Sequence, residues 1–82
     1  MNATRLTPGT RVRIKRAFRD LDGRQPSVGD VLTFVACDYF PHDGGYTLRF
    51  EGGALLRFIE SDPSAAEVLF DVTDTYWEPL DG

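Results

Sequence analysis

The chain has 82 residues, of which 41% are hydrophobic and 27% are charged, and its net charge at pH 7 is −4. This length provides for one domain with one small core, and this composition excludes a disordered or fibrous chain. No apolar run approaches the roughly 18 residues of a membrane-spanning helix, and the first residues lack the apolar stretch of a secretory signal. We therefore expect a cytoplasmic protein that does not enter a membrane.

The charges are unevenly distributed along the chain. Residues 1–40 carry seven basic and four acidic side chains, whereas residues 41–82 carry two basic and nine acidic ones. Such an asymmetry can mark a basic contact face, but it also arises when the two halves neutralise each other across the fold, and we favour the second explanation. Cys37 is the only cysteine, which excludes an internal disulfide, and its apolar neighbours favour a buried small side chain over a reactive thiol.

The first predicted strand covers residues 11–16. Its polar and apolar side chains alternate, which places Val12 and Ile14 in the core. A loop over residues 19–30 follows and ends in the turn sequence Val28-Gly29-Asp30. Loops of about a dozen residues are unusual in a small domain and often carry function, so this loop is a candidate binding segment.

Residues 31–39 are rich in β-branched and aromatic side chains and form the clearest predicted strand. Strict alternation assigns its apolar residues to two faces: Leu32, Phe34 and Ala36 on one, and Val31, Thr33, Val35 and Cys37 on the other. Because both faces are apolar, we expect a central strand that is covered on both sides.

A turn over residues 40–45 leads into a hairpin of two further strands, at residues 46–51 and 54–59. The segment from residue 60 to 78 fits either a helix or a strand, and we favour a short helix at residues 64–70 because Asp62 and Pro63 are typical of a helix start. One face of that helix would carry Ala66, Leu69, Val72 and Tyr76. We expect Trp77 and Leu80 to fold back as apolar anchors.

Together these elements predict a mainly β fold: a small SH3-like antiparallel barrel of four to five strands with a short C-terminal helix. It would form a single domain over residues 1–82, with flexible ends at about residues 1–6 and 79–82. An open α+β sheet is the alternative architecture.

The order of elements also resembles an SH3-like barrel, since a Pro8-Gly9 turn precedes the first strand and a long loop precedes a strongly apolar one. This resemblance implies that the long first loop is used for binding. The chain further resembles a small family of uncharacterised bacterial proteins that has no assigned function, and the likeness covers about residues 7–60. The stretches that carry it are residues 14–18, Asp22-Gly23, Val28-Gly29-Asp30, residues 32–34 and residues 39–48.

Residues that could perform chemistry are few and scattered. Asp38, His42 and Asp43 have metal-ligand character, but their spacing is not specific, and a polar turn explains them better. The serines lack a nucleophile-elbow pattern, and the paired glycines at residues 44–45 and 52–53 are not followed by the Gly-Lys-Ser/Thr of a phosphate loop. We therefore expect no catalytic site, no metal and no cofactor.

Two surfaces remain as candidates for binding. The leading hypothesis is a non-catalytic interaction module for another protein, which would use the long loop, the turn at residues 40–45 and nearby aromatic side chains. Its candidate site residues are Arg24, Tyr39, Phe40 and Tyr46.

The alternative hypothesis is a nucleic-acid-associated barrel that uses the basic face of the first strand. Arg11, Arg13 and Lys15 would lie about 6–7 Å apart on that face, close to the phosphate spacing of a nucleic acid strand. Against it, the sequence pI is about 4.7, whereas nucleic-acid-binding domains are usually basic. An unpaired edge of so small a sheet would also allow a weak homodimer, so we expect either a monomer or a weak dimer.

Overall fold

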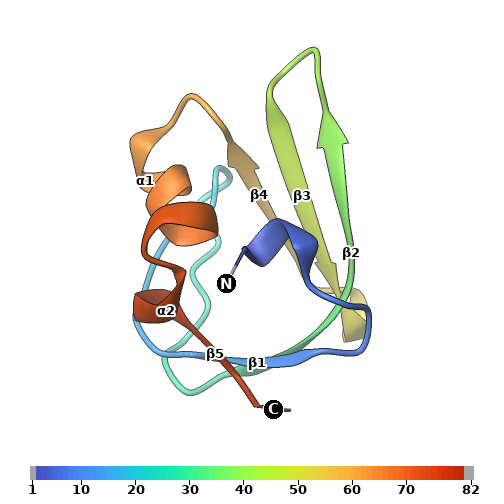
Figure 1. The fold of residues 1–82 in the computed structure, drawn as a ribbon, viewed down its shortest axis with the longest axis vertical. Helices are drawn as coiled ribbons and strands as arrows, with labels where there is room; N and C mark the ends of the chain where they lie inside the picture. Colours follow the sequence, from blue (N-terminus) through green and yellow to red (C-terminus); the bar gives the residue numbers. More distant parts are fainter. Residues whose placement is uncertain (1, 81–82) are drawn as a thin grey trace.

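Five antiparallel strands form one sheet in the computed structural model, which describes residues 2–80 (Figure 1). They are β1 (Arg11–Ile14), β2 (Val31–Phe40), β3 (Gly45–Phe50), β4 (Leu55–Ile59) and β5 (Trp77–Pro79). The strand order is β4-β3-β2-β1-β5, which leaves β4 and β5 as the outermost strands. No pairing between these two strands is present within residues 2–80, so the sheet is open and the predicted closed barrel is not confirmed.

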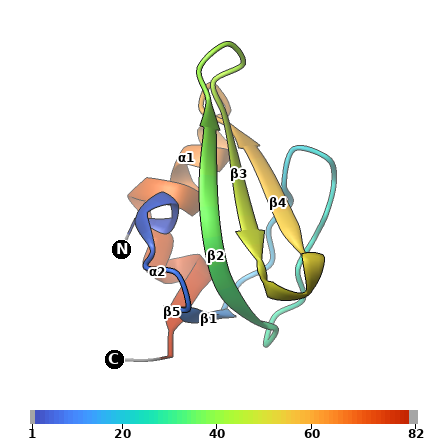
Figure 2. The same cartoon turned by 90° about the vertical axis from the view of Figure 1, so that its right-hand side faces the viewer.

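Short helical segments after β4 pack on one face of the sheet (Figure 2). They are α1 (Pro63–Ala66), the π-helical turn η3 (Glu67–Asp71) and α2 (Thr73–Tyr76), while η1 (Ala3–Arg5) and η2 (Glu51–Gly53) are single 3₁₀ turns. The predicted short helix is confirmed, and it begins as expected, since the Asp62 carboxylate accepts the Ser64 N–H at 2.9 Å. No helix within the described residues is long and apolar enough to cross a membrane.

The π-helical turn changes which helical residues face the core. Val68 and Leu69 are buried, whereas Val72, expected on the same face as Leu69, is 45% exposed. A π-helical turn inserts an extra residue into the helical repeat and so rotates the residues that follow it. Tyr76 returns to the core because a second helix, α2, begins after the break at Val72.

A bulge in β2 overturns the predicted assignment of its two faces. Phe34 pairs with Phe50 and Ala36 pairs with Arg49, so Val35 is an extra residue with no partner of its own in β3. A bulge shifts the alternation of side chains by one residue. Phe34 faces the core before the bulge, and after it Cys37, rather than the predicted Ala36, packs against the core.

The expectation that β2 is covered on both faces is also wrong. The strand is central in the order, but Val31 and Val35 are 45% and 39% exposed on its outer face. The helical segments pack on the other face alone, where the sheet residues of the core lie. An antiparallel sheet tolerates this arrangement, since it can be solvated on one side.

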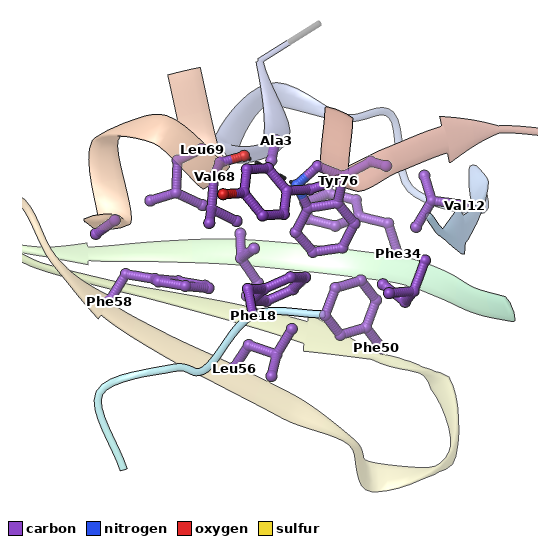
Figure 3. Close-up of a cluster of buried hydrophobic side chains, with 14 residues drawn as sticks. Ala3, Val12, Phe18, Phe34, Phe50, Leu56, Phe58, Val68, Leu69 and Tyr76 are labelled. Atoms are coloured by element: carbon purple, nitrogen blue, oxygen red, sulfur yellow. Dashed lines mark hydrogen bonds between the residues drawn. The ribbon is translucent and has the colours of Figure 1, made fainter. Parts of the chain in front are cut away.

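The core lies between this inner face and the segments after β4 (Figure 3). Phe18, from the segment between β1 and β2, is at its centre, with its ring centroid 5.2 Å from Trp77, 5.8 Å from Tyr76 and 6.1 Å from Phe58. Trp77 is 1% exposed and donates its indole N–H to the Val68 carbonyl at 2.9 Å, as its predicted role as an anchor requires. It lies in β5, a strand that the sequence did not predict, and pairs with Ile14.

The ends that we expected to be flexible, at about residues 1–6 and 79–82, make defined contacts in their described parts. The Asn2 side chain accepts the Thr4 N–H at 2.9 Å and so caps η1, and Ala3 is fully buried. At the other end, the Leu80 N–H donates to the Arg11 carbonyl at 2.9 Å. The expectation also covered Met1, Asp81 and Gly82, which lie outside the described residues.

Candidate functional site

The long loop over residues 15–30 is held against the outer edge of β4, beside which Figure 2 shows it. Leu21 donates its N–H to the Arg57 carbonyl at 2.7 Å, and the Arg57 N–H donates to Asp20 Oδ2 at 3.0 Å. The loop thereby completes the backbone hydrogen bonding of the middle of β4. A loop fastened in this way presents its side chains in one arrangement.

Asp20 is the residue that fastens the loop. Its side chain is fully buried and accepts the backbone N–H groups of Asp22 and Arg24, at 3.0 and 2.6 Å, in addition to that of Arg57. Burial alone raises the pKa of Asp20, but the hydrogen bonds from Arg57 and Arg24 outweigh it and hold the pKa below its usual value. The carboxylate is therefore the charged centre of a fully hydrogen-bonded turn.

Arg24, a predicted binding residue, belongs to this fastening. Its Nη1 lies 3.0 Å from Asp20 Oδ2 and 2.7 Å from Asp22 Oδ2. Asp22 also accepts Arg57 Nη1 at 3.1 Å, so two acidic side chains of the loop pair with Arg24 of the loop and Arg57 of β4. The charge of Arg24 is therefore already matched within the chain.

The three other predicted site residues gather where β2 and β3 lead into their connecting turn. The Tyr46 ring centroid lies 4.8 Å from that of Tyr39 and 5.7 Å from that of Phe70. The Tyr39 hydroxyl donates to Glu60 Oε2 at 3.1 Å, and this hydrogen bond raises the pKa of Tyr39. The rings of Tyr39, Tyr46 and Phe70 lie on the inner side of the sheet.

Phe40 lies on the opposite side of β2 from Tyr39, in a shallow groove of about 320 Å³. Leu21 of the long loop, Asp43 of the turn and Arg57 of β4 line the same groove, and Tyr46 contributes to it. The loop and the turn that were predicted to act together thus meet here. We call Leu21, Tyr39, Phe40, Tyr46 and Phe70 the aromatic end, because Tyr46 touches or shares a groove with the other four.

A second groove, of about 400 Å³, is lined by other residues of the long loop, among them Arg24, Gln25 and Asp30. The core residues Phe50 and Leu56, the partly buried Leu32, and Pro26 and Ala54 are among the residues that line it. Arg24 borders this second groove and not the first. The four predicted site residues are therefore divided between two surfaces, with Tyr39, Phe40 and Tyr46 at the aromatic end.

The basic face of β1 is engaged by the acidic C-terminal part of the chain. Arg13 Nη1 lies 2.9 Å from Glu78 Oε1, and Lys15 Nζ donates to the Asp74 carbonyl at 2.7 Å. Arg11 is exposed on the same strand face. The Arg13–Glu78 pair joins a basic side chain of the first half to an acidic one of the second, whereas the partner of Lys15 is a neutral backbone carbonyl. The two contacts engage two of the three residues proposed to bind nucleic acid.

The residues with metal-ligand character do not converge. Asp38 forms an ion pair with Arg49 at 3.0 Å, while His42 and Asp43 lie in the turn between β2 and β3. Within the part of the chain that the structure describes, no three His, Cys, Asp or Glu side chains are close enough to hold a metal ion. Cys37 is partly buried, and burial together with the nearby Asp38 raises the pKa of its thiol, which lowers its reactivity at neutral pH.

Comparison with known proteins identifies a fold but no function. No protein-family model matches the chain, and no curated protein sequence matches it. Among solved structures, it is similar to an integron cassette protein from the mobile metagenome of Vibrio cholerae, with a TM-score of 0.74 and 26% sequence identity. The match covers 92% of this chain and 88% of that one, and the description of that protein names its genetic setting and no activity.

Three residues of these surfaces were not among the predicted site residues: Asp20 and Leu21, which lie in the predicted binding loop, and Phe70. Asp side chains commonly accept backbone N–H groups of residues that follow shortly after them, so the hydrogen bonds of Asp20 with Asp22 and Arg24 could have been predicted. Its bond to Arg57 spans 37 residues and has no local signal. Phe70 was missed because its position depends on the π-helical turn.

Proposed function

We propose that the chain is a non-catalytic module that binds another protein through its aromatic end. One observation carries this proposal: four large apolar side chains stay exposed around Tyr46. Their exposed fractions are 47% for Leu21, 45% for Tyr39, 52% for Phe40 and 37% for Phe70. Tyr39 and Phe70 lie beside Tyr46 on the inner side of the sheet, and Leu21 and Phe40 share a groove with it on the other side. Large exposed apolar side chains gathered at one end of a small domain are typical of an interaction site, and aromatic residues dominate the binding energy of such sites.

The rigidity of the surroundings supports the same function. Leu21 belongs to a loop that is hydrogen-bonded to β4, and the remaining residues lie in or beside the sheet. A surface that is already ordered loses little conformational entropy when a partner binds. We infer that the fold is an SH3-like barrel opened between β4 and β5, since the long β2 pairs with β1 at one end and with β3 along the rest.

Nucleic-acid binding has less support. Arg13 and Lys15 are held by Glu78 and by the carbonyl of Asp74, and a nucleic acid strand would have to displace these contacts. Capture of partners from a cell lysate at moderate and high salt separates the two functions, because binding to phosphates weakens steeply as salt is raised.

The experiment that tests the proposal is capture of proteins from lysate of the native cells by the tagged chain, after nuclease treatment and at moderate and high salt. We expect a retained protein whose affinity falls about thirtyfold in Phe40→Ala, which corresponds to a binding hot spot of about 2 kcal/mol. Val28→Ala is the matched control, since Val28 is 62% exposed but lies outside the aromatic end. Retention that is equal in Phe40→Ala, Leu21→Ala and Val28→Ala would contradict the proposal.

A further inference from the structure

The two halves of β2 have different neighbours. Its first residues pair with β1, ending at the Arg11–Thr33 pair, and Phe34 then bonds to the backbone of Gly9 and Thr10. From Ala36 onward β2 pairs with β3 alone. In Figures 1 and 2, the end of β2 that leads into the turn stands at the margin of the sheet, with no other strand beside it on that side.

Hydrogen bonds at the two ends of the β3–β4 hairpin show where the backbone groups of β3 point. Glu60 donates to the Gly44 carbonyl, and Phe50 donates to the Ala54 carbonyl. Hydrogen-bonded and non-hydrogen-bonded pairs alternate along an antiparallel ladder. The backbone groups of residues 46 and 48 therefore point toward β4, and those of residues 45, 47 and 49 point toward β2.

The same alternation determines which groups of β2 are unpaired. Tyr39 is opposite Tyr46, and Cys37 is opposite Leu48, so neither Tyr39 nor Cys37 exchanges backbone hydrogen bonds with β3. Their N–H and C=O groups point away from β3, and within residues 2–80 no backbone bond reaches them from that side. Two residues thus present four unpaired backbone groups on one open edge.

We propose that this edge receives an extended, basic segment of a partner protein, which adds as a further strand beside Cys37 and Tyr39. The inference rests on the proposed function and specifies how the partner binds. Unpaired edges are normally protected because they attract other strands, and the same exposed backbone is used for recognition in strand-addition complexes.

The charges around the edge indicate a basic occupant. Asp38 lies between the two residues with unpaired groups, Asp43 is in the adjoining turn, and Glu60 accepts the Tyr39 hydroxyl. Arg49, 3.0 Å from Asp38, is the basic side chain paired with these acids. That pair leaves the charges of Asp43 and Glu60 without an ion-pair partner among the described residues, so the surroundings are net negative, which favours lysine or arginine in the added strand.

The inner side of the edge indicates alternation in the occupant. Successive side chains of a strand point to opposite faces, so residues that alternate with the basic ones would face the exposed rings of Tyr39 and Phe70. Apolar side chains suit that side. The segment that fits is an extended stretch in which basic and apolar residues alternate.

A second copy of the chain fits the edge less well. An antiparallel pair that uses all four groups must place Cys37 opposite Tyr39 of the second copy, and this register sets Asp38 opposite Asp38. A register centred on Tyr39 places Cys37 opposite Pro41, which has no N–H to donate. A register centred on Cys37 places Tyr39 opposite the bulged Val35.

The test uses the full chain labelled with ¹⁵N and a capped seven-residue peptide in which valine and lysine alternate. In the free protein the amides of Cys37 and Tyr39 should exchange rapidly with solvent, and saturating peptide should slow both at least about tenfold. The Arg57 amide, which already donates to Asp20, is the internal control and should not change.

Two peptide variants separate backbone addition from simple adhesion. Methylation of the peptide nitrogens that face the edge removes donors without changing side chains, and it should weaken binding at least about tenfold. A peptide with glutamate in place of lysine should also bind more weakly. Asp38→Lys should reverse this preference, whereas Glu51→Lys makes the same charge change at the other end of β3 and should not.

Several results would overturn the inference: no slowing of the Cys37 and Tyr39 amides by the peptide, equal binding of the methylated peptide, or a preference for glutamate. A stable dimer of the free chain with both amides already protected would assign the edge to a second copy instead. If Phe40→Ala abolishes capture of a protein while no peptide protects the edge, strand addition fails and the proposed function stands. If neither occurs, both fail.

Discussion

The outer edge of β4 and the free half of β2 present similar backbone groups to their surroundings, yet the rest of the chain treats them differently. At β4, the long loop donates through Leu21 and accepts through Asp20, so that both backbone groups of Arg57 are bonded. At β2, the corresponding groups of Cys37 and Tyr39 have no backbone partner within residues 2–80. One edge is closed by a buried carboxylate, and the other is bordered by exposed rings.

The difference suggests that the closed edge serves stability and the open edge serves binding. A chain of 82 residues has a small core, so an additional open edge would add a risk of aggregation without added function. The fastening at β4 also positions Leu21 within the aromatic end. The loop therefore contributes to stability, by closing the β4 edge, and to binding, by placing Leu21 in the aromatic end.

Removing the Asp20 carboxylate should have the largest effect, because it would open the β4 edge as well. We expect Asp20→Ala to lower the free energy of unfolding by about 3 kcal/mol, since buried N–H groups lose their acceptor and Arg24 loses a partner. Urea unfolding measures this change. Amide exchange should show the Arg57 N–H becoming as labile as that of Tyr39.

A matched variant distinguishes the fastening from general packing. Ala17→Gly lies in the same loop, outside the hydrogen-bonded turn, and should leave the relative exchange rates of Arg57 and Tyr39 unchanged. If Asp20→Ala costs no more stability than a surface substitution, about 0.5 kcal/mol or less, then the carboxylate does not hold the loop.

Much of the fold could be predicted because it follows local patterns. Alternation along residues 11–14 and the glycine turn at 52–53 depend on neighbouring residues, and the Asp62 cap lies next to the helix it starts. The bulge at Val35 could not be predicted, since it is defined only by the pairing with β3. For the same reason β5 was missed: its three residues form a strand because Trp77 is buried against the core.

The candidate site was predicted in part for a related reason. Tyr39, Phe40 and Tyr46 flank one turn, so their proximity follows from the hairpin. Arg24 was predicted to bind a partner, but it forms ion pairs with Asp20 and Asp22 that depend on the folded turn and have no signal in the sequence. The role of Asp20 depends on its hydrogen bond with the Arg57 N–H, and a single sequence does not show that residues 37 positions apart lie close together.

Acid should weaken the closed edge selectively. The pKa of Asp20 is lowered in the folded chain below the usual 3.8, so its contribution to stability is complete above that pH and is lost as the pH falls through the folded value. Asp20→Asn, which keeps the shape of the side chain, should therefore cost roughly 1–2 kcal/mol at pH 7 and less at pH 3. Urea titrations of both proteins at the two pH values measure the difference, and an equal cost at both would contradict this role.

The smallest effect is expected on the open side, where Glu60 accepts the hydroxyl of Tyr39. That hydrogen bond is the main cause of the raised pKa of Tyr39, with burial and the charge of Glu60 adding to it. Glu60→Gln should lower this pKa toward its usual value of 10, and it should leave unfolding by urea almost unchanged because the contact is exposed. NMR titration of the Tyr39 ring carbon attached to the hydroxyl measures the shift. A marked loss of stability in Glu60→Gln would mean that the β2 side is fastened as firmly as the β4 side, and the contrast between the two edges would then have to rest on backbone bonding alone.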